Sequence, residues 1–306
     1  MISSYADIDM RLHELVCIML RHAPEDGVYE TMISGVRLRH TTQITQPVHS
    51  IASPSLYIIA QGSKTVTLAN QTYHYDPLHY LVNPVHLPVI GRIEEASIQK
   101  PYLSLQLDFD MDMILDLVKP RPEPAMIQHD GGLFIDSMTS DVLDAASRLL
   151  RLLDHPTDID TLAPLIIREI LYRVLQGEQG AIFAYYAVTG SYINRILQVV
   201  DHINQHYDQP LNISQMAKEV HMSAATLHKY FKQATAMSPI QYQKTIRLQT
   251  ARRLLLGSPI DAAEAGFQVG YESPSQFSRE YARMFGLPPK SDSKQQAEFL
   301  IKQHYE

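Results

Sequence analysis

The chain has very little cysteine, because Cys17 is the single one in 306 residues. One cysteine excludes an internal disulfide framework and a cysteine-based zinc cluster, and Cys17 is predicted to be a small buried side chain. Long apolar runs are also missing, since charges interrupt each of them before the roughly 18 residues that a transmembrane helix needs. Residues 1–7 lack the basic and apolar segments of a secretory signal. These absences predict a cytoplasmic protein with no membrane partner.

Positive charge is scarce overall and is unevenly distributed. The formal net charge is −7. Residues 1–193 contain 13 Lys and Arg against 23 Asp and Glu, a balance of −10, whereas residues 194–306 contain 13 against 10, a balance of +3. A length of 306 residues is enough for two domains. The asymmetry predicts an acidic module joined to a mildly basic one.

The basic part contains an internal repeat with a period of fifty residues. Residues 223–239 read SAATLHKYFKQATAMSP, and residues 273–289 read SPSQFSREYARMFGLPP. The two segments share serine at the first position, proline at the last, and large apolar or aromatic residues at the fifth and ninth. A repeat of this kind is typical of one supersecondary unit that is used twice.

Each copy has the start and stop signals of a short helix, a turn and a second helix. In the first copy, Asn212 begins a short helix, a turn follows at His221, and Ser223 caps the second helix. In the second copy, a short helix at 262–267 and a turn precede Ser273, which is followed by proline at the first helical position. The pattern predicts two helix-turn-helix units.

A connecting helix is predicted at 239–256, between the two units. Three runs there and beyond, RLQTARRLL at 247–255, VGYESPSQF at 269–277 and FGLPP at 285–289, resemble the DNA-binding domain of the AraC/XylS family. The resemblance covers about 193–290. It implies an all-α domain that binds double-stranded DNA. Without the repeat, plain helical hairpins and a solvated face with Arg247, Arg252 and Arg253 would explain these patterns equally well.

The outward faces of the two second helices are the candidate DNA contacts. N-terminal outward residues of such a helix reach base edges, and later basic residues reach phosphates. The family resemblance places contacts at several of the same positions. The apolar stripe that includes Ala224, Leu227 and Phe231 leaves the following residues outward: Ala225, Thr226, His228, Lys229 and Lys232, and on the second helix Ser275, Gln276, Ser278, Arg279 and Arg283.

The first half of the chain alternates between short strands and turns. Strands are predicted at 36–40, 55–60, 65–68, 72–75, 80–82, 89–93 and 102–107. Such a series predicts a small antiparallel barrel or sandwich, and its order resembles the cupin-like N-terminal domain of one AraC branch. Two amphipathic helices follow, at 138–153 and 160–175, the second with an apolar stripe that includes Leu162, Leu165 and Ile170.

The predicted fold class is therefore α+β and multidomain, with a cupin-like β-barrel plus a helical hairpin and then an all-α domain with two helix-turn-helix units. The predicted divisions are 1–177 for effector binding or dimerisation, 178–190 for a linker, 191–290 for DNA binding, and 291–306 for a C-terminal tail. The helical hairpin is the expected homodimer interface.

Two kinds of ligand site are considered in the first half. A metal site is not predicted, because the histidines show no His-x-His pair and no carboxylate at metal-ligand spacing. The second hypothesis is an effector cavity lined by Tyr57, Tyr73, Tyr80 and Arg92, with Tyr75 as a further candidate, although aromatic residues on strands more often pack in a core. We expect no cofactor and no catalytic residue.

The resemblance implies a sequence-specific transcriptional regulator that responds to a small-molecule effector, binds DNA as a homodimer and contacts RNA polymerase. Two alternatives are a cupin-type metal-dependent enzyme fused to a DNA-targeting domain, and a purely architectural DNA binder. Bound iron or zinc would indicate the enzyme. Footprints at many unrelated sites would indicate the architectural protein.

Overall fold

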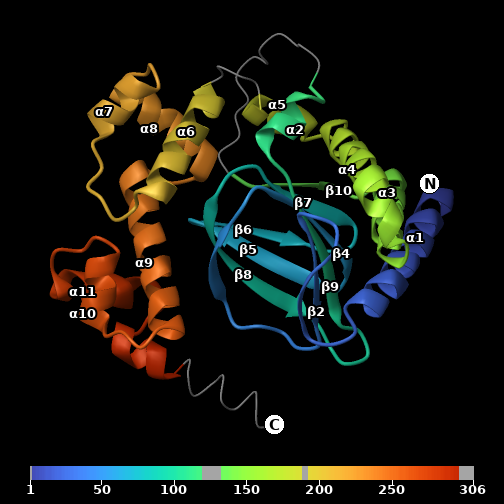
Figure 1. The fold of residues 1–306 in the computed structure, drawn as a ribbon, viewed down its shortest axis with the longest axis horizontal. Coiled ribbons are helices and arrows are strands. Elements are labelled where there is room, and N and C mark those ends of the chain that lie inside the picture. Colours follow the sequence, from blue (N-terminus) through green and yellow to red (C-terminus); the bar gives the residue numbers. More distant parts are fainter. Residues whose placement is uncertain (1, 119–131, 188–191, 296–306) are drawn as a thin grey trace. The chain divides into compact units, whose positions relative to one another are not determined.

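The computed structural model describes residues 2–118, 132–187 and 192–295. The chain divides into two compact units, the first mainly within residues 1–195 and the second mainly after residue 195. The first unit is rich in β-sheet and the second is helical (Figure 1). The predicted fold class is confirmed.

The first unit contains two antiparallel sheets. All seven predicted strands are present, and β1, β3 and β10 are additional. The six-stranded sheet has the order β1 (Gly27–Glu30), β2 (Val36–Thr41), β9 (Tyr102–Asp108), β4 (Ser55–Gln61), β7 (His79–Asn83) and β10 (Phe134–Ser137). The four-stranded sheet has the order β3 (Val48–Ala52), β8 (Leu87–Glu95), β5 (Ser63–Leu68) and β6 (Gln71–Tyr75).

Alternation along the strands gives the six-stranded sheet two different faces. On β9, Leu103 and Leu105 belong to a hydrophobic core shared with the helices of this unit. Ser104 and Gln106 alternate with them along the strand and line a cavity on the opposite face. One face of this sheet therefore holds the helices, and the other faces the four-stranded sheet.

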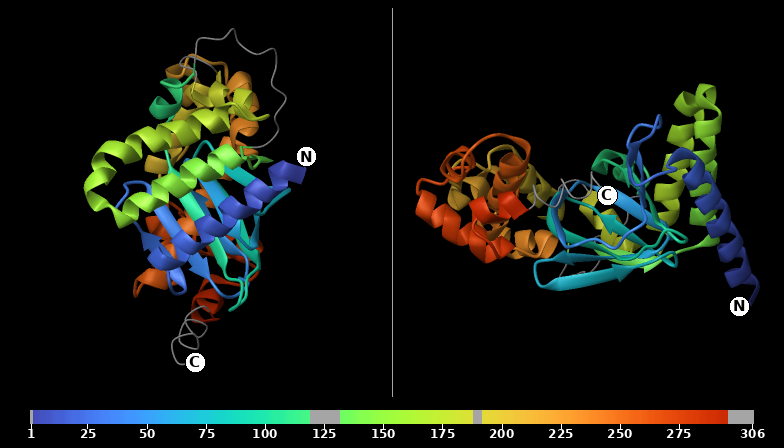
Figure 2. Two further views of the ribbon diagram at one scale, coloured as in Figure 1. Left: turned by 90° about the vertical axis from the view of Figure 1, so that its right-hand side faces the viewer. Right: turned by 90° about the horizontal axis from the view of Figure 1, so that it is seen from below.

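Helices α1 (Ile2–His22), α3 (Ser140–Arg151) and α4 (Ile159–Leu175) form a layer on the first face (Figure 2). Short 3₁₀ turns join α3 to α4. The buried stripe of α4 runs through Ile159, Ala163, Ile167, Ile170 and Val174.

The predicted stripe of α4 is wrong at two positions. Leu162 and Leu165 are 39% and 62% exposed, together with Tyr172 at 49%. The helix begins at Ile159, whose own burial fixes the inward face. Leu162 and Leu165 then fall on the other side of the helix, because successive residues are about 100° apart.

The predicted linker at 178–190 also differs from the structure. Residues Gly180–Ala187 form α5, and Phe183 at its centre is fully buried. The Phe183 ring packs against Phe109 and Phe134, with centroid distances of 5.2 and 5.6 Å. This segment is therefore part of the first unit, and residues 188–190 of the predicted linker lie outside the described residues.

Cys17 is exposed, which corrects the prediction of a buried thiol. On α1 the buried positions are Leu15, Ile18 and Met19. Position 17 points away from them, and its Sγ lies 3.9 Å from Nε2 of His13.

The second unit consists of short helices around one long helix. In chain order they are α6 (Tyr192–Gln205), α7 (Ile213–Glu219), α8 (Ala224–Thr235), α9 (Pro239–Gly257), α10 (Ala262–Gln268) and α11 (Pro274–Phe285). Residues 289–295 are helical as well, and Asp292 is only 2% exposed. The start of the predicted tail at 291 therefore lies within the packed domain.

The two helix-turn-helix units have different residues at equivalent turns. Left-handed backbone occurs at His221 and Ala236 in the first helix-turn-helix unit, with φ of 53° and 59°. In the second helix-turn-helix unit it occurs at Gly270 and Gly286, with φ of 86° and 81°. Glycine is required at position 270, because a Cβ there would lie 2.0 Å from the carbonyl oxygen of Asp208. Ala236 adopts this conformation at a steric cost that glycine would avoid.

Candidate nucleic-acid interface and internal cavity

The exposed face of α8 is set by its cap and its buried stripe. Ser223 Oγ accepts a hydrogen bond from the backbone N–H of Thr226 at 3.1 Å, which fixes the start of the helix. Leu227 and Phe231 are fully buried, and the Phe231 ring meets Tyr242 of α9 edge-on at 5.5 Å. Predicted contact residues on the opposite side are exposed: Ala225, His228, Lys229 and Lys232; Thr226 is partly exposed, and Ala224, predicted inward, is also exposed.

Helix α11 repeats this arrangement. Ser273 Oγ accepts from the backbone N–H of Gln276 at 3.4 Å, and Phe277 and Tyr281 are fully buried. The predicted contact residues Ser275, Gln276, Arg279 and Arg283 are exposed, and Ser278 is partly exposed. Both helices therefore expose small or polar residues in their first turn and basic residues in later turns.

The Gln276 side chain is oriented by Glu280, which also lies on α11. Its Nε2 donates a long hydrogen bond to Oε1 of Glu280 at 3.4 Å. Glu280 is itself held by the Lys244 ammonium at 3.0 Å and by the Tyr271 hydroxyl at 2.8 Å. These hydrogen bonds lower the pKa of Glu280, against the opposing effect of burial, so Glu280 stays ionised.

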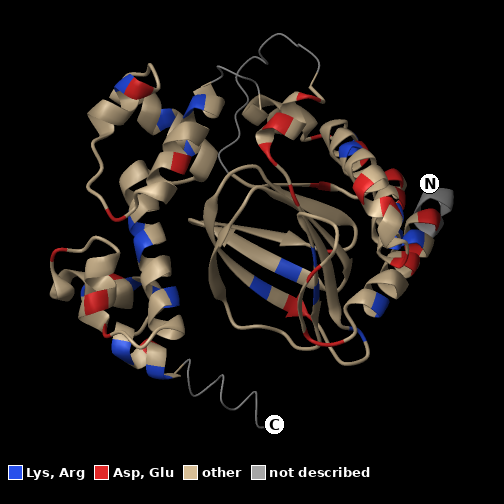
Figure 3. Cartoon of the chain, viewed as in Figure 1, with Lys and Arg blue, Asp and Glu red and all other residues tan. Residues whose placement is uncertain are grey.

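Lys and Arg positions follow one another along α9 (Figure 3), but most of these side chains are engaged inside the unit. The Arg247 guanidinium donates to the carbonyl oxygens of Tyr207, Gly270 and Gln209 at 2.6, 2.8 and 3.0 Å. Arg253 is exposed. Of the three arginines that the sequence offered, Arg253 is therefore the one open to a phosphate.

Arg252 makes a buried ion pair. Its Nε and Nη2 donate to the two carboxylate oxygens of Asp292 at 2.8 and 2.9 Å, and the Tyr281 hydroxyl donates to the same carboxylate at 2.7 Å. The side chains of Arg252 and Asp292 are 17% and 3% exposed. The pair fastens α9 to the helical segment after α11, and sequence spacing gave no sign of it.

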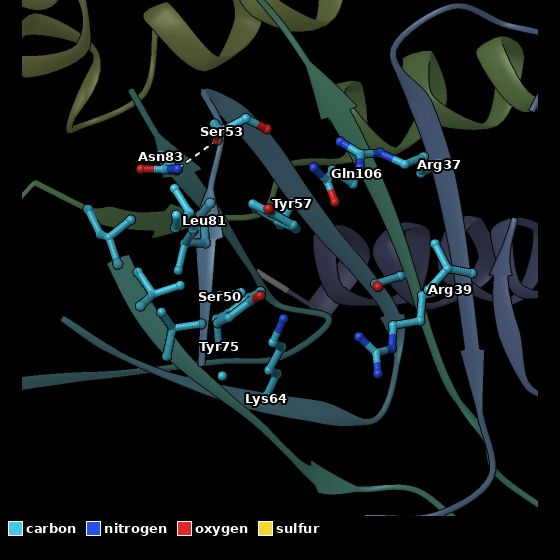
Figure 4. A pocket seen from close by; sticks show the side chains of 18 of the residues that line it. Arg37, Arg39, Ser50, Ser53, Tyr57, Lys64, Tyr75, Leu81, Asn83 and Gln106 are labelled. Carbon is cyan, nitrogen blue, oxygen red and sulfur yellow. Dashed lines mark hydrogen bonds between the residues drawn. The ribbon is translucent and has the colours of Figure 1, made fainter. Parts of the chain in front are cut away.

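The first unit contains a cavity of about 240 Å³ between its two sheets. Side chains from both sheets point into it (Figure 4). Its apolar lining includes Leu81 and Val89, and its polar lining includes Asn83, Ser104 and Gln106. The hydroxyl of Tyr75 and Oδ1 of Asn83 are buried there without a hydrogen-bond partner in the described part of the chain.

Three cationic side chains line this cavity: Arg37 and Arg39 from β2, and Lys64 from β5. Arg37 pairs with Asp108 on β9. The Lys64 stem lies against Gly91, where a Cβ would come within 3.1 Å of its Cε, and its Nζ lies 5.7 Å from the centroid of the Tyr57 ring. Burial and the nearby Arg39 guanidinium lower the pKa of the Lys64 ammonium from 10.5 to about 8.

Of the five residues named from sequence as candidates for an effector cavity, Tyr57 and Tyr75 line the cavity. Tyr73 donates from its hydroxyl to Gln71 at 2.7 Å near a turn. Tyr80 is buried in the core shared with the helices, and Arg92 is directed outward and pairs with Glu94 at 3.5 Å. The structure does not bring all five together.

Among the described residues, no His, Cys, Asp and Glu side chains gather in a group of three or more that could hold a metal ion. The buried His40 instead uses Nδ1 in a 2.7 Å hydrogen bond with the carbonyl oxygen of Ala23. Within the same ranges, the helices are too short or too polar to span a bilayer.

Two family models match the chain in the order of its two units. Residues 32–182 match the AraC-type transcriptional regulator N-terminus, and residues 216–295 match a helix-turn-helix domain. The chain belongs to the AraC/XylS family of transcriptional regulators. As an AraC-family protein it is a DNA-binding regulator, and the exposed faces of α8 and α11 lie in its DNA-binding domain.

Similar regulators cover different shares of the chain. The lactose operon transcription activator of Staphylococcus xylosus is 24% identical over 235 residues, which is 76% of this chain and 80% of the relative. The HTH-type transcriptional regulator ArgR of Pseudomonas aeruginosa is 28% identical over 155 residues, so the chain covers only 46% of that protein.

The fold is shared with ToxT of Vibrio cholerae. The structure of ToxT from strain O395 matches with a TM-score of 0.53 at 11% identity, covering 84% of this chain and 96% of ToxT. A ToxT structure with a bound unsaturated fatty acid matches with a TM-score of 0.51 at 10% identity, covering 85% and 93%. At these identities the likeness concerns the fold alone.

Proposed function

We propose that this AraC-family regulator is controlled by a small molecule that binds in the cavity of the first unit and changes the affinity of the second unit for DNA. The observation that carries the proposal is an internal cavity with unsatisfied polar groups in one unit, together with two capped, exposed recognition helices in the other. ToxT, which has a similar fold, has been observed with a fatty acid bound. A ligand can act in this way only if it binds two arrangements of the protein with different affinities.

For DNA reading, we propose that α8 and α11 enter successive major grooves on one face of the duplex. Helix α9, which connects the two helix-turn-helix units, has 19 residues and is therefore roughly 28 Å long at about 1.5 Å per residue. One turn of B-DNA is about 34 Å. A single chain can then read an asymmetric site in two parts.

The base-reading role of α11 is tested by Gln276→Ala. Glutamine pairs bidentately with adenine in the major groove, so we expect a loss of about 1–3 kcal/mol and relaxed preference at one or two base pairs. The measurement is a titration against a panel of single-base variants of the bound site.

Arg283→Ala is the matched control for this titration, because Arg283 is exposed on the same helix but lies two turns later, where basic residues reach phosphates. Arg283→Ala should weaken binding to all the DNA sequences equally and reduce the salt dependence of binding. If Gln276→Ala also weakened every variant equally, α11 would be a backbone clamp and not a reader of bases.

We propose that the exposed side of α4 forms a homodimer interface. Leu162, Leu165 and Tyr172 are exposed within about a quarter of the helix circumference. Burying such a stripe against a second copy would remove apolar area from water.

Leu165→Glu should therefore convert a dimer into a monomer in sedimentation equilibrium at tens of micromolar protein. Ile98→Glu is the control, because Ile98 is even more exposed, at 81%, but lies outside the helical layer. A wild-type protein that sediments as a monomer, or a dimer that tolerates Leu165→Glu, would contradict the interface.

We further propose that the chain has no catalytic activity. We also propose that it contacts RNA polymerase while it is bound to DNA. The similar proteins are transcriptional regulators. Purified protein that contained stoichiometric iron or zinc would favour the enzyme alternative.

A further inference from the structure

We propose that the cavity of the first unit is a site for a small oxyanion, the carboxylate or phosphate group of a small metabolite, held by Lys64 and Arg39. The proposal deepens the effector role proposed above and rests on it for the effect on DNA. The binding itself is argued from the lining of the cavity.

Two of the three cations that line the cavity have no counter-charge among the described residues. Arg37 is neutralised by Asp108. Arg39 makes one long hydrogen bond, to Thr41 Oγ1 at 3.4 Å, and Lys64 has neither an ion pair nor a hydrogen bond among the residues that the structure describes. An enclosed cation without a counter-charge is costly, and a bound anion would supply that charge.

Hydrogen-bond donors from different strands converge in the cavity. Figure 4 shows the Lys64 ammonium and the Arg39 guanidinium pointing into the same part of the cavity, from β5 and β2. The Tyr75 hydroxyl is buried, and no described residue lies within hydrogen-bond geometry of it. Tyr75 lies on β6, directly opposite Lys64 in the strand register. Hydrogen bonds between ionised groups and oxyanions are stronger than neutral ones. Three donors from three strands thus face one space.

A glycine on β8 makes room for the Lys64 side chain. The residue opposite its stem is Gly91, and a side chain there would meet Lys64 Cε at 3.1 Å. An alanine at position 91 would require the Lys64 side chain to move by a few tenths of an ångström. The sequence therefore leaves room for a charged side chain at a position where an apolar one would pack at lower cost.

The size of the cavity limits the ligand. A volume of about 240 Å³ is that of about eight molecules of liquid water. This is below the range of roughly 300–1,000 Å³ that is usual for drug-sized ligands. The metabolite should therefore have on the order of ten non-hydrogen atoms, with the apolar lining at Leu81 and Val89 accepting its carbon atoms.

The test is thermal unfolding of the full chain with named probes at tens of millimolar. Succinate is compared with the neutral, equally sized succinamide, and glycerol 3-phosphate with glycerol; inorganic phosphate is added as a third oxyanion. We expect one or more of the oxyanions to raise the unfolding temperature and their neutral counterparts to have no effect. The succinate and phosphate arms show which anionic group the site prefers.

Two variants decide whether the effect belongs to this site. Lys64→Met should lower the affinity for the effective oxyanion about 10- to 100-fold, as expected for loss of a charge-assisted hydrogen bond. Arg92→Met removes a cation from the outward face of the neighbouring strand β8 and should leave the affinity unchanged. The proposal is overturned if no oxyanion stabilises the wild type more than Lys64→Met, or if both variants respond alike.

The DNA response separates this proposal from the effector role. The same probes are added to a DNA titration with a site that the full chain selects. Oxyanions that bind through Lys64 without changing DNA affinity would support the anion site and contradict the effector role. Control of DNA affinity by succinamide or glycerol, unchanged in Lys64→Met, would support an effector and overturn the anion site.

Discussion

Replacing Arg252 by methionine is expected to destabilise the DNA-binding unit by about 3–5 kcal/mol, because it leaves a buried carboxylate without its partner. Asp292 is 3% exposed as a side chain and would retain one donor, the Tyr281 hydroxyl at 2.7 Å. A stability of 5–15 kcal/mol is usual for a whole domain, so the loss should be a large fraction of the total. DNA binding should fail at the temperatures where the unit unfolds.

Hydrogen exchange measured by mass spectrometry can follow this unit separately from the first. Peptides from 239–295 should exchange faster in Arg252→Met, whereas peptides from the barrel should not change. Arg253→Met is the matched control, since Arg253 is the next residue on α9 and is exposed. The double variant Arg252→Met with Asp292→Leu should recover part of the loss. Equal exchange in the two single variants would contradict a structural role for the ion pair.

Replacing Lys64 by methionine is expected to have the opposite effect on the first unit. The pKa of Lys64 is about 8 in the folded protein and 10.5 when unperturbed. Below pH 8, Lys64 is protonated in both the folded and the unfolded state, and the folded state bears the full free-energy cost of burying its charge. From pH 8 to 10.5 the folded state binds fewer protons, so stability rises with pH. At about 1.4 kcal/mol per pH unit, the cost below pH 8 is roughly 3 kcal/mol.

Lys64→Met should therefore raise the free energy of unfolding at pH 7 by up to about 3 kcal/mol, and the gain should vanish by about pH 10.5. The difference between wild type and variant isolates Lys64 from other titrations. The charged groups that face it are Arg37, Arg39 and Asp108. Burial raises the pKa of the neighbouring Tyr57, Tyr75 and Tyr102, the last to about 12. A variant that is less stable than the wild type at pH 7 would contradict an unpaired cation.

How much the sequence could predict depends on how local the determining contacts are. The helix-turn-helix repeat was predicted because Ser223 and Ser273 cap helices that they themselves begin, and each apolar stripe lies within one helix. The Arg252 to Asp292 pair joins residues forty positions apart, and no pattern marks it. The sequence predicts a linker at α5 because GAIFAYYA is apolar on all sides, begins with Gly180 and lies close after Gly177.

The cavity, in contrast, is marked by a local signal in the sequence of β5. In β5, Lys64 shares a strand face with Val66 and Leu68, both buried. A charged residue on the apolar face of a strand indicates either a partner or a ligand. The tyrosines predict the cavity less well, because Tyr73 lies near a turn and Tyr80 is buried in the core shared with the helices.

The central claim is that one chain reads an asymmetric DNA site with two recognition helices. The most direct measurement is selection from a pool of random duplexes by the full chain, followed by sequencing. We expect one recurrent motif with two parts about 10 base pairs apart. The double variant His228→Ala with Lys229→Ala should lose one part, and Gln276→Ala with Arg279→Ala should lose the other. No recurrent motif, or loss of the same base pairs in both variants, would contradict the account.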